Sequence, residues 1–176
     1  MGLHSYDIVP SKTCDSLIEL YENDSQHHER VENESRPTFT QLNLNKYHGN
    51  VIPSLFQLFS KTLDVYKEDV PPAEYLPELQ FIEEFRIKKY EVGGIDRFDT
   101  HVDVGDHMSA KRCLAMLFYL NDVDEGGHTV FPLLETSIQP KKGRVIVFPP
   151  TWEYPHSGEP PISNSKYIMS TYLHYG

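Results

Sequence analysis

The sequence predicts a mainly β protein with helices near its N-terminus, in which the strands form a sandwich or a jelly roll. Two segments with helical periodicity lie within the first 69 residues, and from residue 79 onward short β-rich runs are separated by glycine and proline turns. The length of 176 residues suits one domain. We therefore expect residues 1–78 to supply helical support and a first strand, and residues 79–176 to form the jelly-roll core.

The two helices are expected at 11–23 and 53–69. In the first, apolar residues recur at helical spacing and Ser11 is the expected N-cap. In the second, Pro53 is expected at the first helical position. The second helix carries an apolar stripe made of Leu55, Phe56, Phe59, Leu63 and Tyr66. A stripe of this kind predicts packing against a core rather than a cofactor site.

The remaining segments predict short strands and their connections. Residues 24–36 are polar and read as a loop, residues 38–44 alternate as a strand does, and the proline-rich residues 70–77 read as a connector. Further strands are expected at 79–90, 98–104, 111–120, 128–132, 144–149, 152–157 and 165–174. This order favours helices packed on one outer face of the strands.

Charge and composition exclude several partners. There are 16 Lys and Arg residues against 26 Asp and Glu residues, a net charge of −10. Phosphate recognition needs a surplus of basic residues, so neither nucleic acid nor an anionic membrane surface is an expected partner. No apolar stretch reaches the ~20 residues of a membrane span. Because the first ten residues also lack signal-peptide features, a cytoplasmic location is expected, with Cys14 and Cys113 reduced.

A candidate metal site comes from three residues. His101 and Asp103 are two positions apart, which places both side chains on one face of a strand. His156 follows the strongly apolar segment 145–148 and is the best third ligand, whereas His107 and His128 sit in turns and are not expected to bind metal. Two histidines and one carboxylate form the facial triad that suits non-haem Fe(II) and leaves open positions for other ligands.

Lys166 is a candidate partner for an anion near that site. It begins the last predicted strand, ten residues after His156, and shares a strand face with Tyr172 and His174. A lysine that points inward is a buried cation and requires an anion. The distal carboxylate of 2-oxoglutarate is such an anion.

Taken together, these residues resemble the prolyl 4-hydroxylase type of Fe(II)/2-oxoglutarate-dependent dioxygenase. The resemblance covers residues 79–174, a little over half of the chain. It rests on an ordered series of motifs: Tyr90 with Gly93-Gly94, His101 with Asp103, the run from Arg112 to Leu120, the run from Gly126 to Pro132, the run from Gly143 to Pro149, then His156 and Lys166.

The resemblance implies a double-stranded β-helix, a cupin-like jelly roll, that hydroxylates proline at its 4-position in a peptide or protein and releases succinate and CO2. It implies Fe(II), 2-oxoglutarate, O2 and ascorbate as a reductant. The implied metal ligands are His101, Asp103 and His156. The implied contacts to 2-oxoglutarate are Lys166, Tyr90, Thr129 and Tyr119. The implied contacts to the substrate are Arg112, Tyr172 and His174.

Two features depart from this pattern. Tyr172 stands where relatives usually carry tryptophan, and Arg112 and Tyr119 have opposite strand parity, so both face the site only if a bulge or a strand end intervenes.

Two alternatives for the function stay open. The same chemistry can act on a small molecule or another side chain, or the chain can be a non-oxidising cupin-like metal binder, which leaves Lys166 and Arg112 without anions. The acidic surface favours neutral or basic substrate segments, and the sequence carries no signal for an oligomeric state.

Overall fold

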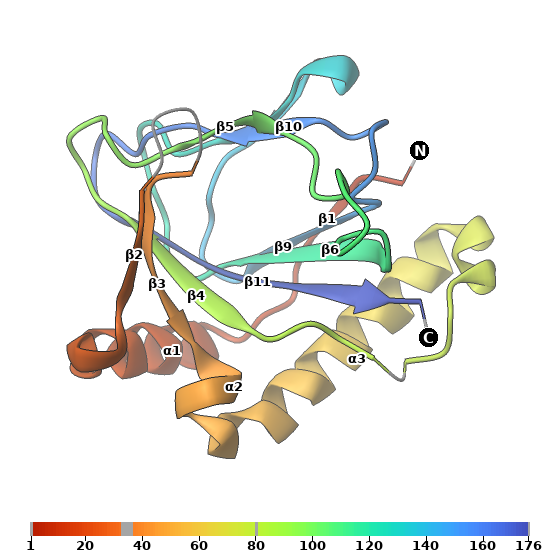
Figure 1. Cartoon of the computed structure of the whole chain (residues 1–176), viewed down its shortest axis with the longest axis horizontal. Coiled ribbons are helices and arrows are strands. Elements are labelled where there is room, and N and C mark those ends of the chain that lie inside the picture. The colour runs from red at the N-terminus through yellow and green to blue at the C-terminus, as the bar shows by residue number, and fades with distance from the viewer. Residues whose placement is uncertain (1, 33–36, 80, 176) are drawn as a thin grey trace.

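The strands form two antiparallel sheets that face each other as a jelly roll (Figure 1). The computed structural model describes residues 2–32, 37–79 and 81–175. The larger sheet has seven strands in the order β1 (His4–Asp7), β9 (Arg144–Phe148), β6 (Arg112–Tyr119), β11 (Lys166–His174), β4 (Arg86–Tyr90), β3 (Phe39–Asn43) and β2 (Glu29–Val31). The smaller sheet has four strands in the order β5 (Phe98–His101), β10 (His156–Gly158), β7 (Thr129–Phe131) and β8 (Thr136–Ile138).

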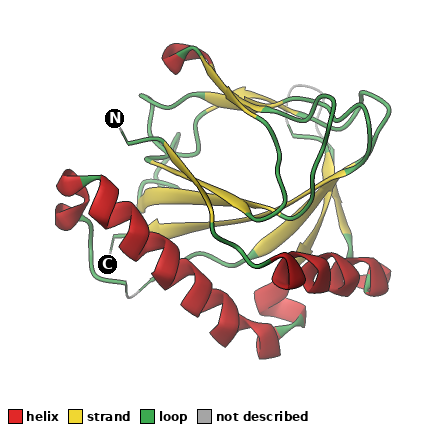
Figure 2. Cartoon of the chain, turned by 180° about the vertical axis from the view of Figure 1, so that it is seen from behind, coloured by secondary structure: helices red, strands yellow, loops and turns green. Residues whose placement is uncertain are grey.

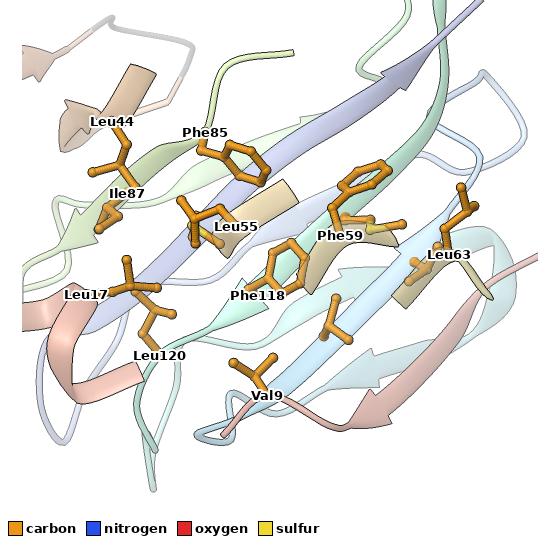
Figure 3. Close-up of a cluster of buried hydrophobic side chains, with 14 of the residues drawn as sticks. Val9, Leu17, Leu44, Leu55, Phe59, Leu63, Phe85, Ile87, Phe118 and Leu120 are labelled. Atoms are coloured by element: carbon orange, nitrogen blue, oxygen red, sulfur yellow. The ribbon is translucent and has the colours of Figure 1, made fainter. Parts of the chain in front are cut away.

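The helices lie on the side of the larger sheet that is turned away from the smaller one (Figures 1 and 2). They are α1 (Ser11–Asn23), α2 (Leu44–Tyr47) and α3 (Ile52–Asp69). Leu17 of α1 and Phe59 of α3 pack with Phe118 of β6 in a buried cluster between helices and sheet (Figure 3). This arrangement confirms the expected jelly roll with helices on one outer face. Among the described residues, no helix is long and apolar enough to cross a membrane.

A second cluster of buried side chains lies between the two sheets. Alternation along β6 sends Leu117 and Tyr119 into this inner cluster and Met116 and Phe118 toward the helices. Both faces of the larger sheet are therefore buried along β6, which explains why its sequence is an almost unbroken apolar run. The inner cluster surrounds the space in which the candidate site residues meet.

The helix boundaries differ slightly from the sequence expectations. Helix α1 spans the predicted 11–23, but Pro10 occupies the N-cap position and Ser11 is the first helical residue, without a side-chain capping bond. Helix α3 begins one residue earlier than predicted, which places Pro53 at its second position. Four members of its apolar stripe are buried, whereas Phe56 is 37% exposed.

Three predicted strands are shorter in the structure. Within 79–90 only Arg86–Tyr90 forms a strand, and residue 80 lies outside the described residues. Strand β5 ends at His101 rather than at residue 104. The segment predicted at 152–157 is a turn closed by a bond from Tyr154 N to Thr151 O, and β10 begins only at His156, because Pro155 has no backbone N–H to pair.

The short strands β1, β2 and β8 are absent from the sequence expectations. Strand β2 lies inside the expected loop 24–36, of which residues 33–36 lie outside the described residues. The proline-rich connector contains a 3-10 helix at Pro71–Tyr75. The expected strands near β3, β6, β7, β9 and β11 are present within a few residues. Both cysteines are free and buried, as expected.

Candidate functional site

Three potential metal ligands converge between β5 and β10. His101 ends β5 and His156 begins β10, and the antiparallel pairing of these strands puts the two residues directly opposite each other. Asp103 lies two residues beyond the end of β5, so its approach to His101 arises from the chain leaving the sheet rather than from strand alternation. Its carboxylate lies 3.3 Å from His101 Nε2 and 3.6 Å from His156 Nε2. One potential ligand atom from each residue lies within 4.8 Å of the other two.

Backbone carbonyls orient both imidazoles. His101 Nδ1 lies 2.8 Å from the carbonyl oxygen of Asp99, and His156 Nδ1 lies 3.1 Å from that of Tyr154. A carbonyl oxygen only accepts, so each Nδ1 carries the proton and each Nε2 lone pair is free to bind a metal. Phe98 stacks on His101 at 3.5 Å between ring centroids, which further restricts that ring.

The electrostatics of the three side chains suit a divalent cation. Burial pushes the pKa of Asp103 upward, but its close approach to the imidazoles of His101 and His156 outweighs the effect of burial, so that pKa is below its ordinary value. Burial lowers the pKa of His156, which keeps the imidazole neutral. Asp103 Oδ2 is buried without a hydrogen-bond partner among the described residues. A buried acceptor is rarely left unpaired, so this donor set fits Fe(II).

The same pocket contains the buried cation that the sequence predicts. Lys166 is 1% exposed, donates to the carbonyl oxygen of Gly127 at 2.9 Å, and lies 4.4 Å from the ring centroid of Tyr90. Gly127 has φ 69°, a conformation that favours glycine and that turns this carbonyl toward the lysine. Burial lowers the pKa of Lys166 to about 7, a shift that the charge of Glu159 only partly opposes.

Two further predicted residues lie beside this lysine. Tyr90 and Thr129 line the pocket together with the triad and Lys166. Tyr119 is fully buried and donates to Thr129 Oγ1 at 2.5 Å, so it contacts the pocket through the threonine. His128, in contrast, faces Glu159 at 3.4 Å and stands outside the triad, as expected.

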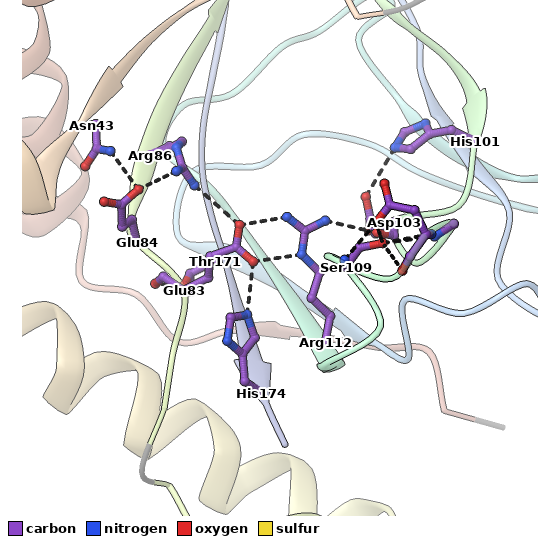
Figure 4. A network of polar contacts seen from close by, with 12 residues as sticks. Asn43, Glu83, Glu84, Arg86, His101, Asp103, Ser109, Arg112, Thr171 and His174 are labelled. Carbon is purple, nitrogen blue, oxygen red and sulfur yellow. Dashed lines mark hydrogen bonds and ion pairs between the residues drawn. The ribbon is translucent and has the colours of Figure 1, made fainter. Parts of the chain in front are cut away.

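The predicted substrate residues form a network next to the triad (Figure 4). Arg112 donates two bonds of 2.7 Å to Glu83 and a third, of 3.0 Å, to the backbone carbonyl of Asp103. His174 Nε2 lies 3.0 Å from the same glutamate, and the Arg112 guanidinium lies 4.1 Å from the ring centroid of Tyr172. Glu83 is thus the anion for Arg112, which corrects the interpretation that this arginine lacks one within the chain.

A bulge resolves the parity of Arg112 and Tyr119. His174 pairs with Arg112 and Leu173 pairs with Leu114, so Cys113 is an extra residue in β6. Cys113 and Leu114 both pack on the helix side, which shifts the alternation by one position. Arg112 therefore lies on the inner side of the sheet with Tyr119, as the bulge alternative requires.

Sequence reasoning missed Glu83 and Lys88. Glu83 precedes β4, and its position at the site depends on contacts with residues about 90 positions away. Lys88 lines the same pocket as Tyr90 and the triad. Because it lies two residues before Tyr90 on the same strand, strand parity was the signal that could have placed it on the inner face.

Comparison with known proteins identifies the family. A model described as the 2OG-Fe(II) oxygenase superfamily matches residues 85–174. Prolyl 4-hydroxylase subunit alpha-1 of Gallus gallus is 32% identical over an alignment of 108 residues that covers 52% of this chain. The alignment covers only 20% of that relative, so the chain spans a small part of its length.

Two solved structures share the fold over nearly the whole chain. The viral collagen prolyl hydroxylase of Paramecium bursaria Chlorella virus 1, solved with 2OG, has a TM-score of 0.76 at 22% identity and covers 100% of this chain and 97% of its own. A Pseudomonas putida prolyl-4-hydroxylase has a TM-score of 0.75 at 16% identity and covers 99% and 93%. Half of the chain matches the family model, and the three potential metal ligands share one pocket with Lys166, Tyr90 and Thr129, so the chain belongs to the 2OG-Fe(II) oxygenase superfamily.

Proposed function

We propose that this chain hydroxylates a proline residue of a peptide or protein at the 4-position, with one O2 and one 2-oxoglutarate consumed and succinate and CO2 released. The observation that carries the proposal is that one pocket contains both the potential metal ligands and a buried cation. In this pocket, an unpaired carboxylate oxygen of Asp103 lies beside two oriented histidines, and the ammonium of Lys166 is buried nearby. The relatives named as prolyl hydroxylases support proline as the target.

The triad would hold Fe(II), which with 2-oxoglutarate and O2 supplies the oxidant for an unactivated C–H bond. His101 and His156 are held by their Nδ1 contacts, so their Nε2 atoms need little reorganisation to bind the metal. The whole chain would act as one catalytic domain, in which the helices support the larger sheet. Ascorbate would serve as the external reductant.

Lys166 would pair with the distal carboxylate of 2-oxoglutarate. Its ammonium is buried and its only described hydrogen bond goes to a neutral carbonyl, so an anion would compensate its desolvation. Tyr90 and Thr129 would complete this end of the pocket, with Tyr119 fixing the threonine hydroxyl.

The peptide would lie in a groove that starts at Asp103 and continues past Tyr172 and Arg112. This groove has a volume of about 390 Å³. Glu83 holds Arg112 in place, so this arginine would meet the peptide with an ordered side chain rather than a mobile one. His174 lies outside the groove lining and would act by holding the Glu83 carboxylate.

The test incubates the protein with Fe(II), 2-oxoglutarate, ascorbate and proline-containing peptides, and measures peptide mass and succinate. A gain of one oxygen on proline in step with succinate supports the proposal. Succinate without peptide oxidation would move the chemistry to another substrate, and no succinate at all would favour the non-oxidising metal binder.

Variants assign the residues. Asp103→Ala should abolish turnover and Fe(II) binding, whereas the matched His128→Ala should retain both. Lys166→Ala should raise the 2-oxoglutarate concentration needed for half-maximal rate by at least tenfold, because it removes a charged partner. An unchanged requirement would mean that a different residue pairs with the cosubstrate.

A further inference from the structure

Lys88 is a cation at the site for which the proposed reaction has no role. It lies on β4, where it pairs with Ile168 of β11 on one side and with Gln41 of β3 on the other. Its neighbours two positions away, Arg86 and Tyr90, share its strand face. Lys88 lines both the pocket that contains the triad and the groove that leads away from it. It therefore stands where these two spaces meet.

Within the described part of the chain, Lys88 differs from the other cations of the groove because it pairs with no carboxylate. Arg86 pairs with Glu83 and Glu84, and Arg112 pairs with Glu83 at 2.7 Å. Among the residues that the structure describes, no carboxylate lies within ion-pair distance of Lys88 Nζ. Its ammonium instead lies over the ring of Phe39, 5.1 Å from the ring centroid.

The surroundings of Lys88 leave its charge incompletely compensated. Burial lowers its pKa to about 8, and the charge of Asp103 opposes that shift. Once Asp103 binds a metal dication, this opposing charge is engaged elsewhere. The other groove carboxylate, Glu83, already accepts from Arg112 and faces His174. A carboxylate brought by a ligand is then the best available partner for the ammonium.

We propose that Lys88 is a specificity-determining residue that pairs with the side chain of an Asp or Glu close to the hydroxylated residue of the substrate peptide. The inference rests on the proposed function and names its substrate class. The groove carries Arg86, Lys88 and Arg112 against Glu83 and Asp103, and Asp103 belongs to the metal. The groove is thus locally cationic although the chain has a net charge of −10.

The source of the carboxylate is a side chain rather than the end of the peptide. The groove has lining residues beyond Lys88 on both sides, with Gln41 and Pro37 toward β3 and Tyr172 and Arg112 toward β6. A peptide can therefore continue past the lysine in either direction. A terminal carboxylate would fit only a chain that stops there.

The test compares fluorescent peptides that contain one proline and, within two residues of it, either Glu or the uncharged isostere Gln. Binding is measured by anisotropy without oxygen, on protein loaded with Fe(II) and 2-oxoglutarate. The Glu peptide should bind at least tenfold more tightly, as expected for a charged hydrogen bond in a partly buried site. Amidation of the peptide C-terminus should leave this ratio unchanged.

Variants at two neighbouring positions identify the lysine. Lys88→Met keeps an unbranched side chain of similar length but removes the charge, so it should bind both peptides alike, whereas Lys88→Arg should restore the preference. The matched control is Lys89→Met, because Lys89 points to the other face and pairs with Glu22 and Glu91. It should keep the preference of the wild type.

The inference is overturned if the wild type binds both peptides equally, if Lys88→Met retains the preference, or if amidation and not the Glu-to-Gln change weakens binding. It is also overturned if Lys88→Met weakens 2-oxoglutarate binding and leaves the peptide ratio intact. The ratio of wild-type affinities for the Glu and Gln peptides tests the inference even if a variant fails to fold. Failure of the proposed function is seen separately, as absence of oxygen on proline when air is admitted.

Discussion

Replacing Lys166 with Met should stabilise the protein in the absence of 2-oxoglutarate. The lysine is 1% exposed and its pKa is lowered to about 7, compared with about 10.4 in an unfolded chain. At about 1.36 kcal/mol per pKa unit, holding this residue at pH 7 costs roughly 4 kcal/mol of unfolding free energy. Loss of the bond to the buried Gly127 carbonyl returns about 1–3 kcal/mol of that. The variant should therefore be more stable at pH 7 by about 2 kcal/mol.

The stability difference between wild type and Lys166→Met should depend on pH. Between pH 7 and pH 10 the unfolded chain binds more protons at Lys166 than the folded protein does, so the stability of the wild type rises with pH in that window. From pH 7 to pH 9 the wild type should gain about 2 kcal/mol relative to Lys166→Met. The advantage of the variant should therefore shrink to about zero by pH 9.

Urea unfolding at pH 7 and pH 9 measures these differences. Because wild type and variant are compared at each pH, titration of the other groups cancels. At one fixed 2-oxoglutarate concentration, the ligand should stabilise the wild type more than the variant. A difference in unfolding free energy that is the same at both pH values would refute the reasoning from the buried ammonium.

Two more substitutions test the network and the core. Glu83→Gln should lower the unfolding free energy by about 2 kcal/mol, because it removes the charge paired with Arg112 at a partly exposed site. Glu84→Gln, at a more exposed carboxylate, should lower it by under about 1 kcal/mol. Equal losses for the two variants in urea unfolding would contradict this expectation. Phe59→Ala should lower the unfolding free energy by about 3–5 kcal/mol because the ring is fully buried, and Phe56→Ala on the same helix should lower it far less. A small loss of melting temperature for Phe59→Ala would show that the core is not packed as described.

Residue type and spacing were enough to predict much of the site. Alternation along β11 predicted that Lys166 shares a strand face with Tyr172 and His174, and its position ten residues after His156 favoured the face toward the metal site. The triad was predicted from His101, Asp103 and His156 although the geometric reason was partly wrong, since Asp103 lies outside its strand. The ligand types carried that prediction.

The features that sequence did not reveal depend on long-range contacts. Glu83 belongs to an irregular segment whose place is set by bonds to Thr171 and Arg112, and no local pattern marks it. Strands β1 and β8 have three or four residues and are defined by their pairing partners rather than by propensity. The bulge at Cys113 likewise follows from how two strands pair.

Strand β11 links the two halves of the site. Lys166 at its start lies beside the pocket for the proposed cosubstrate, and His174 at its end belongs to the network beside the groove. Eight residue steps of a strand span roughly 26 Å. Neighbours on both edges hold this strand, so the distance between its ends is constant. A single strand of the core therefore fixes the separation between the proposed 2-oxoglutarate pocket and the network beside the groove.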